Sequence, residues 1–124
     1  MEIGMSYTSK MIAEEKYSAA ALGSGSVAVF ATPAMILLME EAARLAVQDA
    51  LPEGATTVGT AVNIQHLAAT PVGANVSATA VLIEINGRNL TFEVEAKDDK
   101  RLIGKGIHLR AVIDITRFMS KLTQ

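Results

Sequence analysis

The longest run of hydrophobic residues lies between residues 27 and 39, and the pattern predicts one long helix over residues 33–51. Thr32 is a good N-cap residue, and Pro33 suits the first helical position because the amide that proline lacks would be unpaired there. Residues 34–39 are hydrophobic on every side of the helix, which predicts that this part is buried. Pro52 and Gly54 end the helix, whose length is roughly 28 Å over residues 33–51.

After Gly54 the pattern changes to that of β-strands. Thr, Val and Ile are frequent over residues 56–67, small and β-branched residues alternate over 75–85, and hydrophobic residues alternate with polar ones over 90–97. A last long strand is expected over residues 103–113. Asn86-Gly87 and residues 98–100 mark turns. Ahead of the helix, residues 11–13 are expected to belong to a first strand.

This order of elements predicts a single α+β domain over residues 1–124. One strand, one buried helix and four antiparallel strands follow each other, and a sheet that curls around the helix would cover its hydrophobic surface. That arrangement is the hotdog fold, although another α+β fold of one helix and one sheet would give a similar pattern. The loop Gly23–Ser26 consists of small residues, and we expect it to be more mobile than the rest of the chain.

Composition narrows the classes of function. The net charge is −2 and only 4% of the residues are aromatic, so neither a basic nucleic-acid surface nor a base-stacking platform is expected. No segment is long and hydrophobic enough to span a membrane, and no signal peptide is visible, which predicts a cytoplasmic protein. The chain has no cysteine, which excludes disulfides, thiolate metal sites and a cysteine nucleophile. The hydrophobic fraction, 50%, suggests burial against a second copy.

Three polar residues, Thr32, Glu40 and His66, stand where the pattern asks for hydrophobic ones. Each also has a purely structural interpretation. Thr32 is an adequate helix cap, and Glu40 could pair with Arg44 four residues later. His66 shares a strand face with Val62 and Ile64, where a histidine is more often a core residue than a catalyst.

The remaining candidates are less distinct. Glu41 competes with Glu40 as the functional carboxylate, and Glu40 is favoured because it closes a run that looks buried, where a carboxylate is costly unless hydrogen-bonded or functional. His108 and Arg110, on the last strand, could simply be exposed strand residues. Thr32 and Glu40 would lie about 12 Å apart along the helix axis. One helix does not bring both to one atom, whereas a second protomer could.

Two segments resemble the fluoroacetyl-CoA thioesterase-like family of hotdog proteins: residues 31–42, which read ATPAMILLMEEA, and residues 58–73, which read VGTAVNIQHLAATPVG. Residues 104–111 are similar to the family's last strand, and the likeness extends from about residue 20 to residue 118. The resemblance implies that Thr32, Glu40 and His66 are the working groups and that Gly59 and Arg110 line the acyl-CoA site. It also implies a homodimer with sites at the subunit interface.

The resemblance predicts an enzyme that hydrolyses a small acyl-CoA thioester to the free acid and coenzyme A. Coenzyme A would bind as part of the substrate, with no metal or other cofactor. Hydrolysis could proceed through a covalent intermediate or by direct attack of water. A hotdog hydratase or dehydratase using His66 and Glu40 is an alternative, in which Thr32 has no role. A module that binds acyl-CoA without turnover is another.

One departure concerns the loop ahead of the helix. The family's namesake carries bulky aromatic residues there, over the acyl pocket, whereas this chain has Gly23-Ser24-Gly25-Ser26. The sequence therefore does not predict a fluorine-selective lid, and the acyl group stays unspecified.

Overall fold

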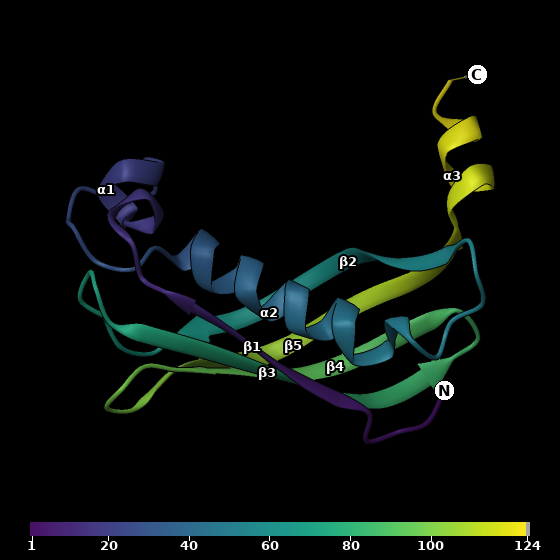
Figure 1. Ribbon diagram of the computed structural model, residues 1–124, viewed down its shortest axis with the longest axis horizontal. Coiled ribbons are helices and arrows are strands. Elements are labelled where there is room, and N and C mark those ends of the chain that lie inside the picture. The colour runs from purple at the N-terminus through teal and green to yellow at the C-terminus, as the bar shows by residue number, and fades with distance from the viewer. Residues whose placement is uncertain (124) are drawn as a thin grey trace.

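A computed structural model describes residues 1–123 as one five-stranded antiparallel sheet with a long helix lying across one face (Figure 1). The elements follow in the order β1 (Ser6–Ile12), the 3-10 turn η1 (Glu15–Tyr17), α1 (Ala19–Leu22), α2 (Thr32–Gln48), β2 (Ala55–His66), β3 (Asn75–Asn86), β4 (Asn89–Lys97), β5 (Leu102–Asp114) and α3 (Ile115–Lys121). The predicted single strand, central helix and four later strands are all present.

The strands lie in the order β1-β3-β4-β5-β2. β3, β4 and β5 form consecutive antiparallel hairpins, and the turn between β3 and β4 contains Gly87 with φ +63°, a conformation that favours glycine. β2 does not pair with β3, the next strand in the chain, but with β5. β1 and β2 are therefore the two edges of the sheet.

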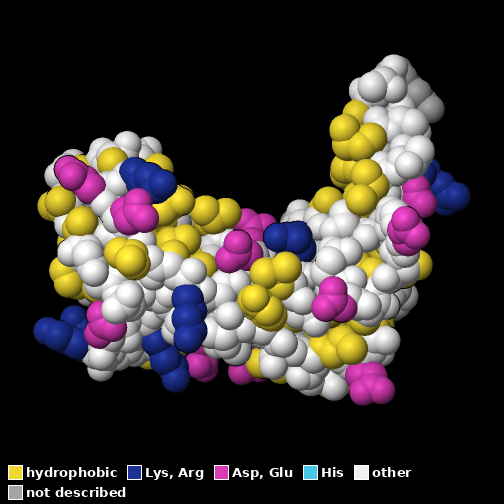
Figure 2. Space-filling view, in the orientation of Figure 1, with side chains coloured by type: hydrophobic (Ala, Val, Ile, Leu, Met, Phe, Trp, Pro, Cys, Tyr) yellow, Lys and Arg dark blue, Asp and Glu magenta, His cyan; other side chains and the backbone are white. Residues whose placement is uncertain are grey.

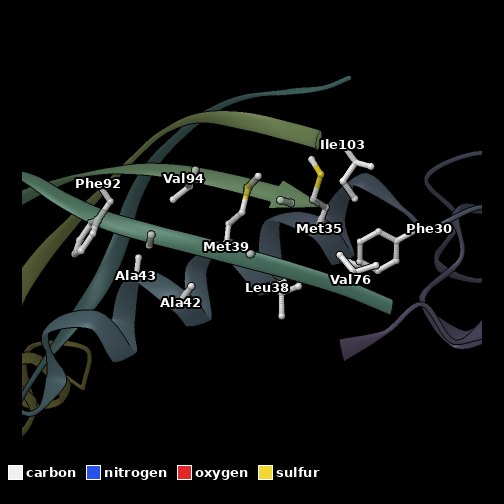
Figure 3. Close-up of a cluster of buried hydrophobic side chains, with 14 of the residues drawn as sticks. Phe30, Met35, Leu38, Met39, Ala42, Ala43, Val76, Phe92, Val94 and Ile103 are labelled. Atoms are coloured by element: carbon white, nitrogen blue, oxygen red, sulfur yellow. The ribbon is translucent and has the colours of Figure 1, made fainter. Parts of the chain in front are cut away.

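The core lies between α2 and the curved sheet (Figure 3). Met35, Leu38 and Met39 project from the helix toward the strands, where Phe92 and Val94 are fully buried. Burying each such large side chain stabilises the fold by about 1.5–3 kcal/mol. The larger set of buried residues adds alanines from α2 and β3, which allow the helix to lie close to the sheet: Ala34, Ala42, Ala43, Ala78 and Ala80.

The helix differs from the prediction at both ends and on one side. It begins one residue early, with Ala31 as the N-cap and Thr32 already helical, because the Thr32 hydroxyl is engaged elsewhere and caps no backbone amide. It ends at Gln48, and the chain then turns through residues 49–51. The prediction that residues 34–39 are buried on every side of the helix is wrong for a single chain, because Leu37 is 52% exposed.

β2 is an open edge with unusual exposure. Residues 59–63 are all exposed, including Val62, and the pairing register with β5 shifts between Gly59 and Ala61. The pairing is regular from Ala61 to His66, so Val62, Ile64 and His66 share one strand face, as predicted. An edge strand with free backbone groups and exposed hydrophobic residues is a template for pairing with another strand.

Two projections rise at opposite ends of α2, on the same side of the sheet (Figure 1). One contains α1 and the turn before it, and the other is α3, which the sequence pattern did not predict. Figure 2 shows a hollow between them, with charged side chains at its floor. Among residues 1–123, no helix is long and hydrophobic enough to cross a membrane, and no cluster of histidine and carboxylate side chains is placed to hold a metal ion.

Candidate active site

The start of α2 and the end of β2 meet at one side-chain contact. Thr32 is the first helical residue of α2, and its Oγ1 lies 2.7 Å from Nδ1 of His66, the last residue of β2. This distance is that of a strong hydrogen bond between a hydroxyl and an imidazole. A hydroxyl paired with an imidazole is the arrangement that activates a threonine or serine as a nucleophile.

The His66 ring is set up to act as a base. Burial lowers its pKa below 6.5, and a backbone contact with Ala68 works in the opposite direction. The ring is therefore neutral at neutral pH, and a neutral ring nitrogen can accept the proton of Thr32. Its Nε2 atom is buried and has no hydrogen-bond partner among the described residues, so Nδ1 is the nitrogen that contacts the hydroxyl.

A surface pocket of about 370 Å³ opens beside this pair. Its walls come from the α1 end of the molecule and the segment after β2, and they are lined by Ala19, Ser24, Val29, Phe30, Thr32, His66, Leu67, Ala68 and Ala69. The lining is mostly hydrophobic, as an acyl group requires. A larger pocket of about 490 Å³ lies at the β1–β3 edge and contains none of the predicted site residues.

Glu40 belongs to a second polar cluster, two turns further along α2. Its Oε2 lies 3.4 Å from a guanidinium nitrogen of Arg110 and 3.8 Å from Nε2 of His108, both on β5. The structure gives no hydrogen bond or ion pair between Glu40 and Arg44, the pairing that the helical spacing suggested. Glu40 is only partly buried, with a side-chain exposure of 38%, so the carboxylate is held by β5 and still open to a ligand.

His108 and Arg110 are not exposed strand residues, as their pattern suggested, but buried ones, at 1% and 6% exposure. Both side chains belong to the face of β5 that is directed toward α2, whereas Ile107 and Leu109 on the other face are each 37% exposed. Arg110 donates hydrogen bonds to the hydroxyl and the carbonyl of Thr57. Their i, i+2 spacing places both on one strand face, but the hydrophobic residues Ile107 and Leu109 favoured burial of the opposite face.

The protonation of this cluster follows from its contacts. His108 Nδ1 lies 2.8 Å from the carbonyl oxygen of Ala61 and donates to it, which leaves Nε2 to accept from Arg110 at 3.1 Å. Burial, together with the Arg110 charge, lowers the pKa of His108, and the Glu40 charge opposes this. Burial also lowers the pKa of Arg110, against the effect of Glu40. His108 is thus a neutral support that holds the guanidinium beside the Glu40 carboxylate.

Gly59 completes the cluster. It pairs with Arg110 in the sheet, and a Cβ atom at this position would lie 2.6 Å from Oε2 of Glu40 and 3.2 Å from the His108 ring. Only glycine leaves room for the carboxylate where it stands. The sequence suggested Arg44 as the partner of Glu40, so the grouping of Glu40 with Gly59, His108 and Arg110 is a finding of the structure.

Within one chain the two clusters remain apart. Gly59 and His66 are seven residues apart on the same strand, which corresponds to roughly 23 Å. Glu40 and Thr32 lie about 12 Å apart along α2. One protomer thus holds a hydroxyl–imidazole pair at one end of β2 and a supported carboxylate near its middle.

Comparison with known proteins identifies the relatives of this chain. The family model described as fluoroacetyl-CoA-specific thioesterase, FlK, matches residues 12–116. The chain belongs to this family. The fluoroacetyl-CoA thioesterase of Streptantibioticus cattleyicolor is 44% identical over 96 residues, which cover 77% of this chain and 69% of that protein.

Solved structures agree with the family assignment. The crystal structure of the fluoroacetyl-CoA thioesterase FlK superposes with a TM-score of 0.92 at 35% identity, covering 100% of this chain and 96% of that one. A variant of FlK in complex with fluoroacetate and CoA matches with a TM-score of 0.89, again at 35% identity, over 95% of this chain and 99% of that chain. A hot-dog-like protein from Thermanaerovibrio acidaminovorans, 18% identical, matches with a TM-score of 0.89 over 98% of this chain and 90% of that one.

These comparisons confirm the predicted family, the hotdog fold and the class of thioester hydrolase.

Proposed function

We propose that this protein hydrolyses a small acyl-CoA thioester to the free acid and coenzyme A. The observation that carries the proposal is the 2.7 Å contact between Thr32 and His66 beside a hydrophobic pocket. The FlK relatives support the substrate class, since one of them has been solved with fluoroacetate and CoA. No metal or other cofactor enters the proposed reaction, because coenzyme A arrives as part of the substrate.

In the proposed reaction the Thr32 oxygen attacks the thioester carbonyl while Nδ1 of His66 accepts the hydroxyl proton. The carbon–sulfur bond breaks, the proton passes from His66 to the departing sulfur, and coenzyme A leaves as a thiol. The acyl group then forms an ester on Thr32. Water then attacks this ester while the Glu40 carboxylate, held by Arg110, accepts its proton. The bond between the acyl carbon and the Thr32 oxygen breaks, the free acid leaves, and the proton passes from Glu40 to the Thr32 oxygen.

The proposed reaction needs both clusters at one place, and pairing of two β2 edges would achieve this. In an antiparallel pair about a two-fold axis near Val62 and Asn63, Gly59 of one chain lies opposite His66 of the partner subunit. Opposite residues in an antiparallel pair share a face of the sheet. Gly59 faces Glu40 and His66 faces Thr32, so both clusters lie on the helix-bearing face and would meet across the interface.

Exposure along β2 supports this homodimer. Residues 59–63 are exposed in the single chain, and so is Leu37 on the outer side of α2. We expect sedimentation at micromolar concentration to give a dimer, and a clean monomer at high concentration would contradict the shared site. We further propose that the protein works in the cytoplasm, which the absence of cysteine fits.

The contact between Thr32 and His66 also separates the proposal from its alternatives. A hydratase or dehydratase would use His66 with Glu40 and give Thr32 no role, whereas the structure shows the Thr32 hydroxyl bonded to the imidazole. A module that only binds acyl-CoA would need no base at this position.

The test is release of coenzyme A thiol from a panel of short and medium acyl-CoA thioesters, followed with a thiol reagent. The chain has no cysteine, so the reagent reports the product alone. We expect turnover of at least one short acyl-CoA and a loss of about a hundredfold or more in Thr32→Ala. Binding without thiol release, or a Thr32→Ala variant as active as the wild type, would overturn the proposal.

A further inference from the structure

The C-terminal helix α3 presents a hydrophobic stripe to solvent. Four large residues at helical spacing i, i+3, i+4 and i+7 are 37% to 66% exposed: Ile115, Phe118, Met119 and Leu122. A helix of seven residues is too short to be stable in water by itself. Packing of this hydrophobic stripe against another surface would therefore stabilise α3.

The direction of α3 is fixed by its base. Asp114 caps the helix by accepting from the amide of Arg117, and the amide of Ile115 donates to the carbonyl of Gly54. Asp114 also pairs with Ala55, the first residue of β2. Anchored there, α3 rises on the α2 side of the sheet, and its hydrophobic side faces across the hollow toward the α1 end (Figures 1 and 2).

A matching hydrophobic surface lies at the other end of the same edge. Leu67, which lines the Thr32–His66 pocket, is 48% exposed, and Leu22 and Val27 at the α1 end of the molecule are 48% and 60% exposed. Within one chain this surface is separated from α3 by the whole length of β2, twelve residues or about 40 Å. α3 therefore does not reach the pocket of its own chain.

In a dimer, α3 of one chain can lie close to the pocket of the other chain. Antiparallel pairing of two β2 edges brings the start of one strand, where α3 is anchored, opposite the residues that follow His66 in the other. Both α3 and the pocket lie on the helix-bearing face, and a two-fold axis perpendicular to the sheet keeps them on one side. The hydrophobic stripe of one chain then faces the exposed leucines and valine of the other.

We propose that α3 packs on the partner subunit and forms a wall of the partner's Thr32–His66 pocket, with Phe118 and Met119 limiting the size of the acyl group. This inference rests on the proposed function for the identity of the ligand, but the position of α3 does not. The loop Gly23–Ser26 beside each pocket has only small side chains. The large side chains of α3 from the other subunit would therefore fill space that this loop leaves open.

Cysteine cross-linking tests the position, because the chain has no cysteine of its own. The variant Leu67→Cys with Met119→Cys should form a covalent dimer on mild oxidation, seen on a non-reducing gel. Leu67→Cys with Ser120→Cys is the matched control, since Ser120 lies on the opposite side of α3. We expect cross-linking at least ten times faster in the first pair. Equal rates, or no covalent dimer, would overturn the proposal whether or not the protein hydrolyses acyl-CoA.

Selectivity between acyl groups of different length tests whether α3 forms a wall of the partner's pocket. Phe118→Ala should raise kcat/KM for octanoyl-CoA relative to acetyl-CoA by about tenfold or more, because it enlarges the pocket, while Ser120→Ala leaves the ratio unchanged. Sedimentation of both variants establishes that the dimer persists. An unchanged ratio in a dimeric Phe118→Ala variant would overturn the role of Phe118. A wild-type protein that releases no coenzyme A would overturn the proposed function, while the cross-linking result would still decide where α3 lies.

Discussion

Thr32 Oγ1 and His66 Nδ1 are separated by 2.7 Å although their residues are 34 positions apart in the chain. The contact explains why the helix does not use Thr32 as its cap. The hydroxyl turns away from the free amides of α2 and toward the last residue of β2, so a helix-initiating threonine becomes half of a hydroxyl–imidazole pair.

Replacing His66 should separate catalysis from folding. His66→Leu removes the proposed base, and we expect kcat/KM to fall by about a hundredfold or more. The free energy of unfolding should change by less than about 1 kcal/mol, because the lost bond to Thr32 is offset by removal of a buried, unpartnered Nε2. Kinetics and urea unfolding of the same preparation measure both. A large loss of stability with full specific activity would make His66 a core residue.

The two neighbouring glutamates make a matched pair. Glu40→Gln keeps the shape of the side chain but removes the charge that faces Arg110, so we expect kcat to fall by about a hundredfold or more. Glu41→Gln changes an exposed residue and should be nearly silent. If the reaction proceeds through an ester on Thr32, mass spectrometry of Glu40→Gln mixed with substrate should detect the acylated chain. A larger loss at Glu41 than at Glu40 would show that the wrong carboxylate was chosen.

Gly59→Ala tests the close approach of β2 to Glu40. The added methyl group would lie 2.6 Å from Oε2, and the flexible end of the Glu40 side chain can move aside. We therefore expect a fold with little loss of stability but a displaced carboxylate, and a decrease in kcat of about tenfold or more. Ala61→Gly, on the same strand but outside this contact, is the control. Wild-type turnover in Gly59→Ala would mean that the carboxylate position has no catalytic importance.

Burial of His66 predicts the acid side of the pH profile. Its pKa in the folded protein is below 6.5, and only the neutral ring can accept the Thr32 proton. kcat/KM should therefore rise with pH, with a midpoint below 6.5, and be level above it. Unfolded chains bind protons at His66 and His108 near pH 6.5, whereas the folded chain does not, so stability should fall as the pH drops below 6.5. A midpoint above 6.5, or stability that increases on acidification, would contradict the burial argument.

The sequence carried enough to predict the helix and the four later strands, because these depend on local pattern. It did not predict the partners of Glu40, for which it suggested Arg44 rather than Arg110 and His108. It did not indicate that His108 and Arg110 are buried. Ile107 and Leu109 made the opposite face of this strand look like the buried one, whereas the assembled sheet directs His108 and Arg110 toward Glu40 of α2.

The exposure of Leu37 also depends on how the chain is assembled and not on the local pattern. The pattern of residues 34–39 predicted burial on all sides, and one chain covers only the side that faces the sheet. α3 escaped prediction because its short stripe follows directly on a long strand pattern, with only Asp114 as a helix start signal. A second copy that covers Leu37 and the hydrophobic stripe of α3 would account for both.

The central claim is that each active site combines Thr32 and His66 of one chain with Glu40 of the partner subunit. Mixed dimers of Thr32→Ala chains and Glu40→Gln chains, purified through two different affinity tags, test this directly. Each homodimer should be nearly inactive. In the mixed dimer one site keeps an intact Thr32, His66 and Glu40, so the account predicts about half of the wild-type activity per dimer. Mixed dimers no more active than the two parent homodimers would contradict the shared site.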